Sequence, residues 1–367
     1  MLIYASISFI MIVSFFSVEK KYFKNFYFPV IFLFFLYFPF ITGINSARPD
    51  YNAYVNIFHE LPELFSPGFF SESRASHTEL GYNIFTGVIR LFTNSPTIFF
   101  ILLCFFSFVF RFNAIKHFVH KEDVVLVLFA FFAHEYLRKD AIQIRNGIAS
   151  AIILFSFISL YKGHRLRFCI WVIMASLFHM VALIALPLVI VINNSSLCKK
   201  SLHVMQGALI IAVVSTFFFS ITDVLLVFEG LGILPRQITT YLHWYRYNRP
   251  LPIYHPVVLK QVILCSLFLF IKNDILFFSN RKAIFLFKIY FISTLYYLVF
   301  LDFEILAGRF GSLFHGVETL FLLQIINTDA VKQKQLMKLA VFVLICSSFI
   351  MNWITFSSVL SFEMTFQ

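Results

Sequence analysis

The chain has 367 residues, of which 60% are hydrophobic and only 13% are charged. Its mean hydropathy of +0.85 excludes a water-soluble domain and indicates a protein that crosses a membrane several times. The net charge of +11 is typical of nucleic-acid-binding proteins, but the basic residues are scattered through short loops, so we expect no nucleic-acid partner.

Apolar runs recur from one end of the chain to the other, separated by short polar breaks. About 20 apolar residues span a bilayer as a helix, and these runs lack the alternating polarity of barrel strands. The sequence therefore predicts an all-α polytopic membrane protein with about 11–12 transmembrane helices in a single transmembrane domain, residues 1–367. The expected helices are residues 2–18, 26–44, 96–112, 124–137, 141–160, 168–192, 203–220, 257–271, 283–301, 308–326 and 339–357.

The first run, residues 2–18, is followed by Glu19 and several lysines and lacks a small-residue cleavage site. We therefore expect a retained helix rather than a signal peptide. The cysteines lie in apolar runs or beside a basic loop and form no CxxC pair. We expect neither a disulfide nor a metal site, and no cofactor.

The basic loops set the orientation, because lysine and arginine accumulate on the cytoplasmic side of a membrane protein. The loops assigned to the cytoplasm are residues 19–25, 111–121, 161–167, 199–200, 272–288 and 332–338. Both termini then lie outside, together with the long loops 45–95 and 221–256.

The run 168–192 has basic residues at both ends, so a single crossing would leave one basic end outside. We expect a helical hairpin that turns near His179 inside the membrane, with its bend buried against neighbouring helices. A single tilted span is the alternative.

The basic residues differ in type between the two sides. Those assigned to the cytoplasm are mostly lysines, whereas those assigned to the outside are nearly all arginines. The outer arginines are Arg48, Arg74, Arg90, Arg138, Arg145, Arg236, Arg246, Arg249 and Arg309. Because a guanidinium matches phosphate and carboxylate oxygens bidentately, this pattern indicates an anion-binding outer face. For any single arginine, the alternative to anion binding is a salt bridge with an acidic residue on the outer side.

The second helix is followed by Arg48, Pro49 and Asp50. Pro49 disfavours helical geometry at Arg48, so we expect a new helix to begin at Asp50, whose carboxylate suits the helix dipole. Tyr51 and Tyr54 share one face of that helix. The alternative is a capped interfacial helix whose tyrosines belong to the membrane belt.

Glu79 precedes an amphipathic stretch, residues 80–92, that cannot cross the membrane without inverting every later loop. We expect this stretch to lie in or near the outer interface. Glu79 is then either a carboxylate that serves only the helix dipole or an acid/base group at the membrane surface.

Between two long apolar runs the chain places Arg138, Lys139, Asp140 and Arg145, a segment that we call the charged knot (residues 138–145). Charge in or beside a bilayer is costly, so a membrane protein that keeps it usually uses it. If a helix restarts near Asp140, Arg145 lies more than a turn inside it and needs an anionic partner, either Asp140 or a bound phosphate.

Three further candidates lie later in the chain. His179 stands among apolar residues, where a histidine is more often a satisfied core residue than a catalyst. Arg309 has Gly308 and Gly311 nearby, which would let backbone approach a ligand. Trp244 lies in the loop 221–256, where aromatic rings suit either a sugar chain or the membrane belt.

Motifs of the common hydrolases, metalloproteases and nucleotide-binding enzymes are absent from the sequence. The carboxylates, histidine and arginines suit displacement of a phosphate leaving group, in which arginines stabilise the departing charge and another group accepts a hydroxyl proton. We expect that acceptor to be Asp50 or Glu79, and His179 as the third choice, because carboxylates near the surface reach a sugar hydroxyl without deep burial.

Several short motifs follow one another along this hydropathy profile. They are Arg48-Pro49-Asp50-Tyr51 with Tyr54, Glu79 with Gly81-Tyr82, Arg138-Lys139-Asp140 with Ile144 to Ala149, Leu177-Phe178-His179 with Ala182-Leu183 and Pro187, and Gly308-Arg309-Phe310. In this order they resemble the EpsG/Wzy group of bacterial polysaccharide polymerases.

The resemblance implies a multi-pass inner-membrane glycosyltransferase, similar in fold to the GT-C-like lipid-linked sugar transferases and independent of metal. Such polymerases join repeat units of O-antigen, capsule or exopolysaccharide on undecaprenyl pyrophosphate at the periplasmic face and release undecaprenyl pyrophosphate. The outer side is then the periplasm, so both termini, which the basic loops place outside, are expected there; membrane lipids and a chain-length regulator protein are expected partners. The expected pyrophosphate contacts are Arg48, Arg138, Arg145 and Arg309, and the expected glycan contacts are Tyr51, Tyr54, Tyr82, Asp140 and Trp244.

Two other classes would use the same features. A transporter (flippase) of lipid-linked glycans would also need intramembrane charge and outer arginines, but it often contains an internal repeat, and none is visible in the sequence. An O-antigen ligase or a membrane O-acyltransferase, the latter centred on His179, is the other alternative.

Overall fold

The computed structural model describes residues 23–46, 50–71, 78–192, 199–234, 236–243, 249–270, 280–327 and 333–356. The regular elements in these ranges are helices, so the predicted all-α class is confirmed. The contacts divide the chain into two units, residues 1–191 with 322–367 and residues 192–321, which are described separately. The expected first helix, residues 2–18, lies outside the described residues.

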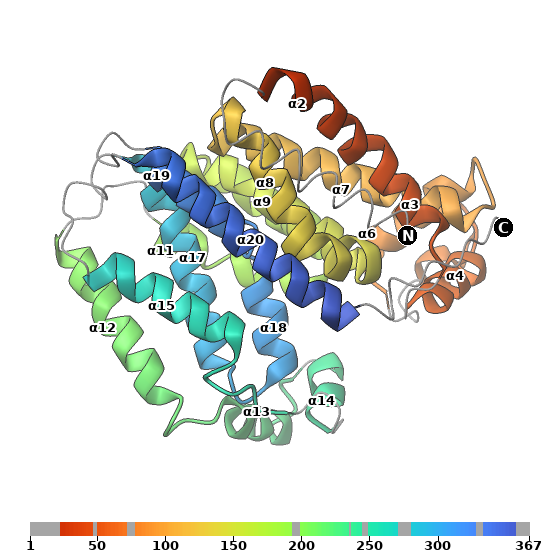
Figure 1. Ribbon diagram of the computed structural model, residues 1–367. Coiled ribbons are helices and arrows are strands. Elements are labelled where there is room, and N and C mark those ends of the chain that lie inside the picture. Colours follow the sequence, from red (N-terminus) through yellow and green to blue (C-terminus); the bar gives the residue numbers. More distant parts are fainter. Residues whose placement is uncertain are drawn as a thin grey trace. The chain divides into compact units, whose positions relative to one another are not determined.

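The first unit holds most of the sequence motifs (Figure 1). Its elements are α2 (Phe23–Phe32), the π-helix η1 (Leu33–Tyr37), α3 (Phe38–Ile44), α4 (Tyr51–Glu60), α6 (Leu80–Arg90), α7 (Pro96–Phe118), the 3-10 helix η2 (Lys121–Asp123), α8 (Val124–Phe131), the π-helix η3 (Phe132–Ile142), α9 (Ile144–Tyr161), α10 (Arg165–Ser176), the 3-10 helix η4 (Met180–Ala185), α11 (Leu188–Val191) and α20 (Lys334–Phe356). The helix α7 packs against α3 and α9, and α10 packs against α9.

The helix α20 packs along α8 and η3 (Figure 1). Its Lys338 ammonium forms an ion pair with the buried Asp123 carboxylate, which also accepts a hydrogen bond from Asn327. These contacts attach the C-terminal helix to the segment that precedes α8.

Helix α7 is longer than expected. The sequence predicts that it ends at residue 112 and is followed by a basic loop, but the helix continues to Phe118. The reason is Arg111, which is only 1% exposed and lies in the core, where buried carboxylates neutralise it. Arg111 is therefore a core residue rather than a cytoplasmic loop residue.

The segment 168–192 is a hairpin, as predicted. Helix α10 ends at Ser176, the chain turns at residues 177–179, and η4 and α11 return along α10. Before the hairpin, α9 ends in a Schellman motif, with Gly163 at φ 82° and its N–H bonded to the carbonyl of Leu160.

The charged knot is not a simple break between two helices. The α-helix α8 ends at Phe131, the π-helix η3 runs from Phe132 to Ile142, and α9 begins at Ile144. Arg145 therefore lies in the first turn of α9 rather than more than a turn inside it. Segments of π-helix are frequently found at functional sites.

The second unit consists of α12 (Lys199–Ser215), α13 (Ile221–Gly230), α14 (Arg236–His243), α15 (Pro256–Phe270), α17 (Arg281–Val299), α18 (Glu304–Ser312) and the first half of α19 (Val317–Ile326). The expected helix 308–326 is thus divided into α18 and α19, and the expected outer loop 221–256 contains α13 and α14. Leu225, Leu242, Phe303 and Leu306 form a buried apolar cluster in this unit.

Among the described residues, 4 helices are long and apolar enough to span a membrane: Tyr27–Ile44, Pro96–Phe118, Ile144–Tyr161 and Arg281–Val299. Shorter apolar helices cover residues 180–191, 201–215, 256–270 and 317–326. The protein is therefore an all-α, multi-pass membrane protein, although several of the expected spans are shorter helices than the sequence predicts.

Candidate functional site

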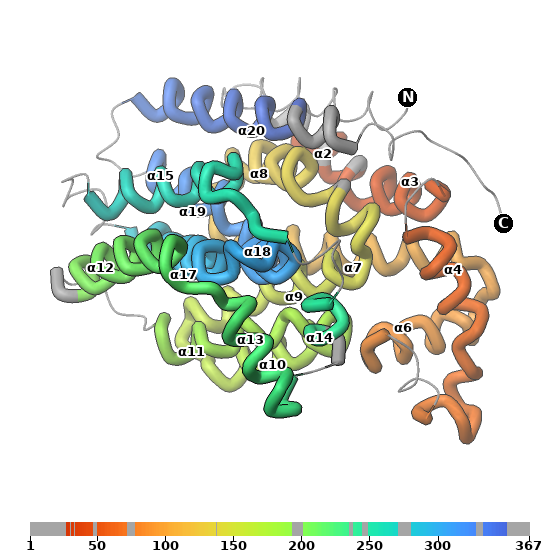
Figure 2. The backbone as a smooth tube through the Cα atoms, turned by 90° about the horizontal axis from the view of Figure 1, so that it is seen from below, coloured from red at the N-terminus to blue at the C-terminus, as the bar shows by residue number. Residues whose placement is uncertain are grey.

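Helices α4 and α6 lie beside each other in the first unit (Figure 2). Tyr51, Tyr54 and Phe58 form the buried face of α4, and Asp50 is its N-cap, as expected for a helix that begins after Pro49. Arg90 at the end of α6 donates a hydrogen bond to the carbonyl of Leu61, which follows α4. This contact joins the two short helices.

Helix α6 has a polar buried face and an apolar exposed face. Tyr82, Asn83 and Thr86 are fully buried, whereas Leu80, Ile84, Val88 and Leu91 are exposed along the opposite side. An apolar face turned away from the protein suits contact with lipid, as expected for a helix in the membrane interface.

The start of α6 is attached to the turn of the hairpin. The backbone N–H groups of Gly81 and Tyr82 donate to the carbonyl of Leu177 at 2.8 and 3.2 Å. A Cβ atom on Gly81 would lie 2.6 Å from the Leu177 Cβ and 2.8 Å from its carbonyl oxygen, so only glycine permits this approach. Glu79 is thereby placed beside His179.

Glu79, Arg145 and His179 meet through the Glu79 carboxylate. Its Oε1 lies 3.0 Å from Nδ1 of His179 and accepts the backbone N–H of Met180 at 3.3 Å. Its Oε2 accepts a hydrogen bond from Nη1 of Arg145 at 2.6 Å. We call these three side chains the Glu79 cluster. The anionic partner of Arg145 is therefore Glu79, and not Asp140.

Two tyrosines flank the arginine. The guanidinium carbon of Arg145 lies 5.9 Å from the ring centroids of both Tyr54 and Tyr82, close enough for cation–π attraction. The side chains of the Glu79 cluster are 25% (Arg145), 18% (Glu79) and 14% (His179) exposed, so each keeps some accessible surface. The positive end of the α9 dipole adds to the positive charge at Arg145.

The charges of the cluster determine the ionisation of Glu79. Burial by itself would raise the pKa of this carboxyl group, but the hydrogen bond with His179 and the Arg145 charge lower it to about 2. The pKa of Tyr54 is raised by burial, although Arg145 partly opposes this effect. Glu79 is thus an anion at any physiological pH and a weak proton acceptor.

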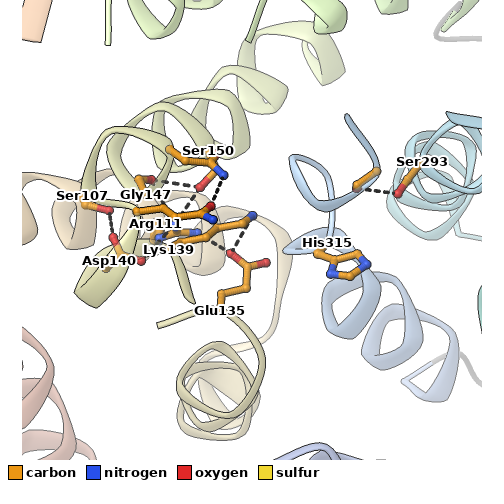
Figure 3. A network of polar contacts seen from close by, with 12 residues as sticks. Ser107, Arg111, Glu135, Lys139, Asp140, Gly147, Ser150, Ser293 and His315 are labelled. Carbon is orange, nitrogen blue, oxygen red and sulfur yellow. Dashed lines mark hydrogen bonds and ion pairs between the residues drawn. The ribbon is translucent and has the colours of Figure 1, made fainter. Parts of the chain in front are cut away.

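A second polar network includes Lys139 and Asp140 of the knot, and Arg111 of α7 is its centre (Figure 3). Its guanidinium donates to Glu135 at 2.8 Å and to Asp140 at 3.2 Å, and also to the carbonyl of Gly147 at 3.1 Å and the Ser150 hydroxyl at 2.8 Å. These bonds connect α7, η3 and the beginning of α9, so they help to fix the turn of α9 that carries Arg145.

The same network contains a second cation. Lys139 lies 3.4 Å from the Glu135 carboxylate, and Ser107 donates to Asp140. The two cations and two carboxylates are all at most 4% exposed and together are formally neutral, the arrangement that makes buried charge tolerable.

The remaining expected site residues lie elsewhere. Arg138 is exposed, whereas the Asp140 side chain is 1% exposed and forms an ion pair with Arg111; its contact with a sugar stays a prediction. Asp50 is exposed, and Tyr51 is buried against the ring of Phe100.

In the second unit, the Arg309 guanidinium stacks on the Tyr241 ring at 4.7 Å and donates to its hydroxyl at 3.0 Å. The expected contacts Arg48 and Trp244 lie outside the described residues. Among the residues that the structure describes, no group of three or more metal-ligating side chains is close enough to hold a metal ion.

The sequence pattern does not single out Arg111 and Glu135, which the structure places at the centre of the buried network. A usable signal is present, because Arg111 interrupts an otherwise apolar run five residues before Lys116. Hydropathy alone predicts the start of a loop at this position, since it does not distinguish a helix end from a buried charge.

Comparison with known proteins gives a family match. A model of the EpsG family matches residues 30–366, nearly the whole chain. No curated protein and no solved structure matches it.

Proposed function

Since the chain belongs to the EpsG family of polysaccharide polymerase-like membrane proteins, we propose that it joins repeat units carried on undecaprenyl pyrophosphate at the periplasmic face of the bacterial inner membrane. Each new glycosidic bond releases one undecaprenyl pyrophosphate. The observation that most supports this proposal is the meeting of Glu79, Arg145 and His179, which come from three separate segments of the sequence.

In this proposal His179 is the proton acceptor and Glu79 positions it. The Glu79 carboxylate accepts the Nδ1–H of His179, and Nε2 is the ring nitrogen that takes the proton. A carboxylate with a pKa of about 2 is a poor base, but it stabilises the imidazolium that forms when the histidine accepts a proton. The order expected from the sequence, carboxylates before histidine, is therefore reversed in the proposal.

The reaction then follows from these positions. The acceptor sugar hydroxyl loses its proton to Nε2 of His179 while its oxygen attacks the anomeric carbon of the donor. The bond from that carbon to the pyrophosphate oxygen breaks, and its electron pair leaves with the pyrophosphate. Arg145 stabilises the departing charge, for which a guanidinium fork with five N–H donors is suited.

The test uses a deletion strain that is complemented with single variants. We expect Arg145→Ala to lower the polymerisation rate about 10²–10³-fold, the usual cost of removing one donor at a developing charge, and to leave single repeat units on the lipid acceptor. Arg145→Lys should recover only part of the rate, because it restores the charge without the fork. Arg165→Ala is the control, since Arg165 is an exposed arginine at the start of α10, outside the Glu79 cluster.

Gel electrophoresis of surface polysaccharide separates the outcomes, provided that immunoblots show equal protein in the membrane. A normal ladder from Arg145→Ala would contradict the assigned role of Arg145. The deletion itself tests the function: single repeat units on the acceptor support a polymerase, whereas complete absence of repeats indicates a ligase and full ladders indicate an acyltransferase.

A further inference from the structure

A basic cavity lies in the first unit, apart from the Glu79 cluster. It has a volume of about 560 Å³ and is lined by residues of α7, α9, α10 and the turn between α9 and α10. A cavity of this size accommodates a small ligand or the headgroup of a lipid.

The lining of the cavity is strongly cationic. Lys116, Lys162 and Arg167 contribute three positive charges, with His117 and His164 beside them, and none of the described lining residues is acidic. Within the described part of the chain, the three cations have no carboxylate within salt-bridge distance. Clustered positive charge without an internal counter-ion favours an anionic ligand.

One wall of the cavity is aromatic. The Trp171 ring packs edge-on against Phe155 at 5.0 Å and against Phe110 at 5.8 Å, and both Trp171 and Phe155 line the cavity. Tryptophan next to lysine and arginine is typical of the headgroup level of a membrane, where an apolar ring surface meets charged groups.

The backbone holds the cations around the cavity. The Schellman motif at Gly163 reverses the chain between α9 and α10, so that Lys162 at the end of α9 and Arg167 in the first turns of α10 line the same cavity. Lys116 reaches the cavity from the last turn of α7, which packs against α9.

We propose that this cavity binds the phosphate-bearing headgroup of an anionic lipid in the cytoplasmic leaflet. The inference goes beyond polymerisation and rests only on the proposed orientation, in which the loop 161–167 faces the cytoplasm. Basic pockets between membrane helices on the cytoplasmic side are a known form of lipid recognition.

The experiment measures binding rather than polymer synthesis, so its failure is distinct from failure of the proposed function. Purified full-length protein in neutral detergent is titrated with short-chain phosphatidylglycerol, with phosphatidylcholine of the same chains, and with inorganic phosphate. The shift in melting temperature gives the apparent dissociation constant. The second ligand tests the headgroup charge, and the third separates a lipid from a free phosphate.

The test variant is Lys162→Gln/Arg167→Gln, and the control is Lys121→Gln/Arg165→Gln. The control removes the same charge at two exposed basic residues that do not line the cavity. We expect phosphatidylglycerol to bind the test variant about 30-fold more weakly than wild type, from roughly five-fold per lost cation, and to bind the control nearly as wild type.

Two outcomes would overturn the proposal. The first is equal affinity of the test and control variants for phosphatidylglycerol. The second is inorganic phosphate binding as tightly as phosphatidylglycerol, which would identify the ligand as a free anion. Equal melting temperatures of the ligand-free variants in detergent would show that both proteins are folded.

Discussion

Replacing Glu79 by glutamine tests the Glu79 cluster most directly. Glutamine keeps the size and shape of the side chain but removes the charge that faces Arg145 at 2.6 Å and His179 at 3.0 Å. The amide can present its nitrogen or its oxygen to each partner, so it neither balances the guanidinium nor stabilises an imidazolium.

The structure gives the size of the effect. Lowering the pKa of Glu79 from 4.5 to about 2 corresponds to about 3 kcal/mol of preferential interaction with the ionised carboxylate. Because the side chain is only 18% exposed, solvent screening reduces this value modestly. We expect Glu79→Gln to lose up to about 3 kcal/mol of stability and to slow polymerisation by about two to four orders of magnitude, since a positioned histidine base and its orienting carboxylate act as a unit.

The assay supplies lipid-linked repeat units to membranes of the complemented deletion strain and follows chain lengthening on gels. Glu60→Gln is the matched control, because Glu60 is an exposed glutamate at the end of α4. Melting curves of the purified proteins separate lost stability from lost rate. A Glu79→Gln protein that melts at a lower temperature but polymerises at the wild-type rate would refute the catalytic reasoning and leave Glu79 a structural role.

Three further predictions follow from local contacts. Gly81→Ala should lower the free energy of unfolding by about 1–3 kcal/mol and reduce polymerisation, because its Cβ would collide with Leu177. The control is Gly207→Ala, where a Cβ meets nothing within 4 Å and should cost no stability. Equal melting temperatures of the two variants would contradict the prediction. Arg111→Met leaves Lys139 as the one cation in a network with two buried carboxylates and should destabilise by about 3–5 kcal/mol, seen as lower melting and less protein in the membrane; wild-type melting would contradict it. The melting difference between wild type and Glu79→Gln should persist at pH 5 and shrink only as the pH falls toward 2, because a lowered carboxyl pKa gives stability that is present above the unfolded value of about 4.5 and lost through the folded one; loss of the difference by about pH 5 would contradict the assignment.

Much of the fold follows from local patterns in the sequence. Long apolar runs identify α7, α9 and α17, because a bilayer requires continuous apolar surface over a fixed length. The hairpin at residues 168–192 follows from basic residues at both of its ends, which favour a turn over a single crossing. The predicted helix ends are wrong at Arg111 and in the knot, where a helix contains charged residues. A hydropathy profile does not distinguish a charged residue inside a helix from the end of a helix.

The candidate site was only partly accessible to sequence reasoning. Glu79, Arg145 and His179 stood out individually because each is a charged or titratable group beside apolar runs. The pairing of these three residues does not follow from the sequence. Asp140 is the acid nearest to Arg145 in the sequence, but it pairs with Arg111 instead.

The sequence by itself determined the class of the protein, its helical membrane character, the turn at His179 and the residue types available for chemistry, because these depend on composition and on spacing along one helix. Only the tertiary structure decided which charges meet. Glu79 is 66 residues from Arg145 and 100 from His179, and their contact exists because the backbone of α6 bonds to the hairpin turn at Leu177. An ion pair is selected by distance in space, which local pattern does not specify.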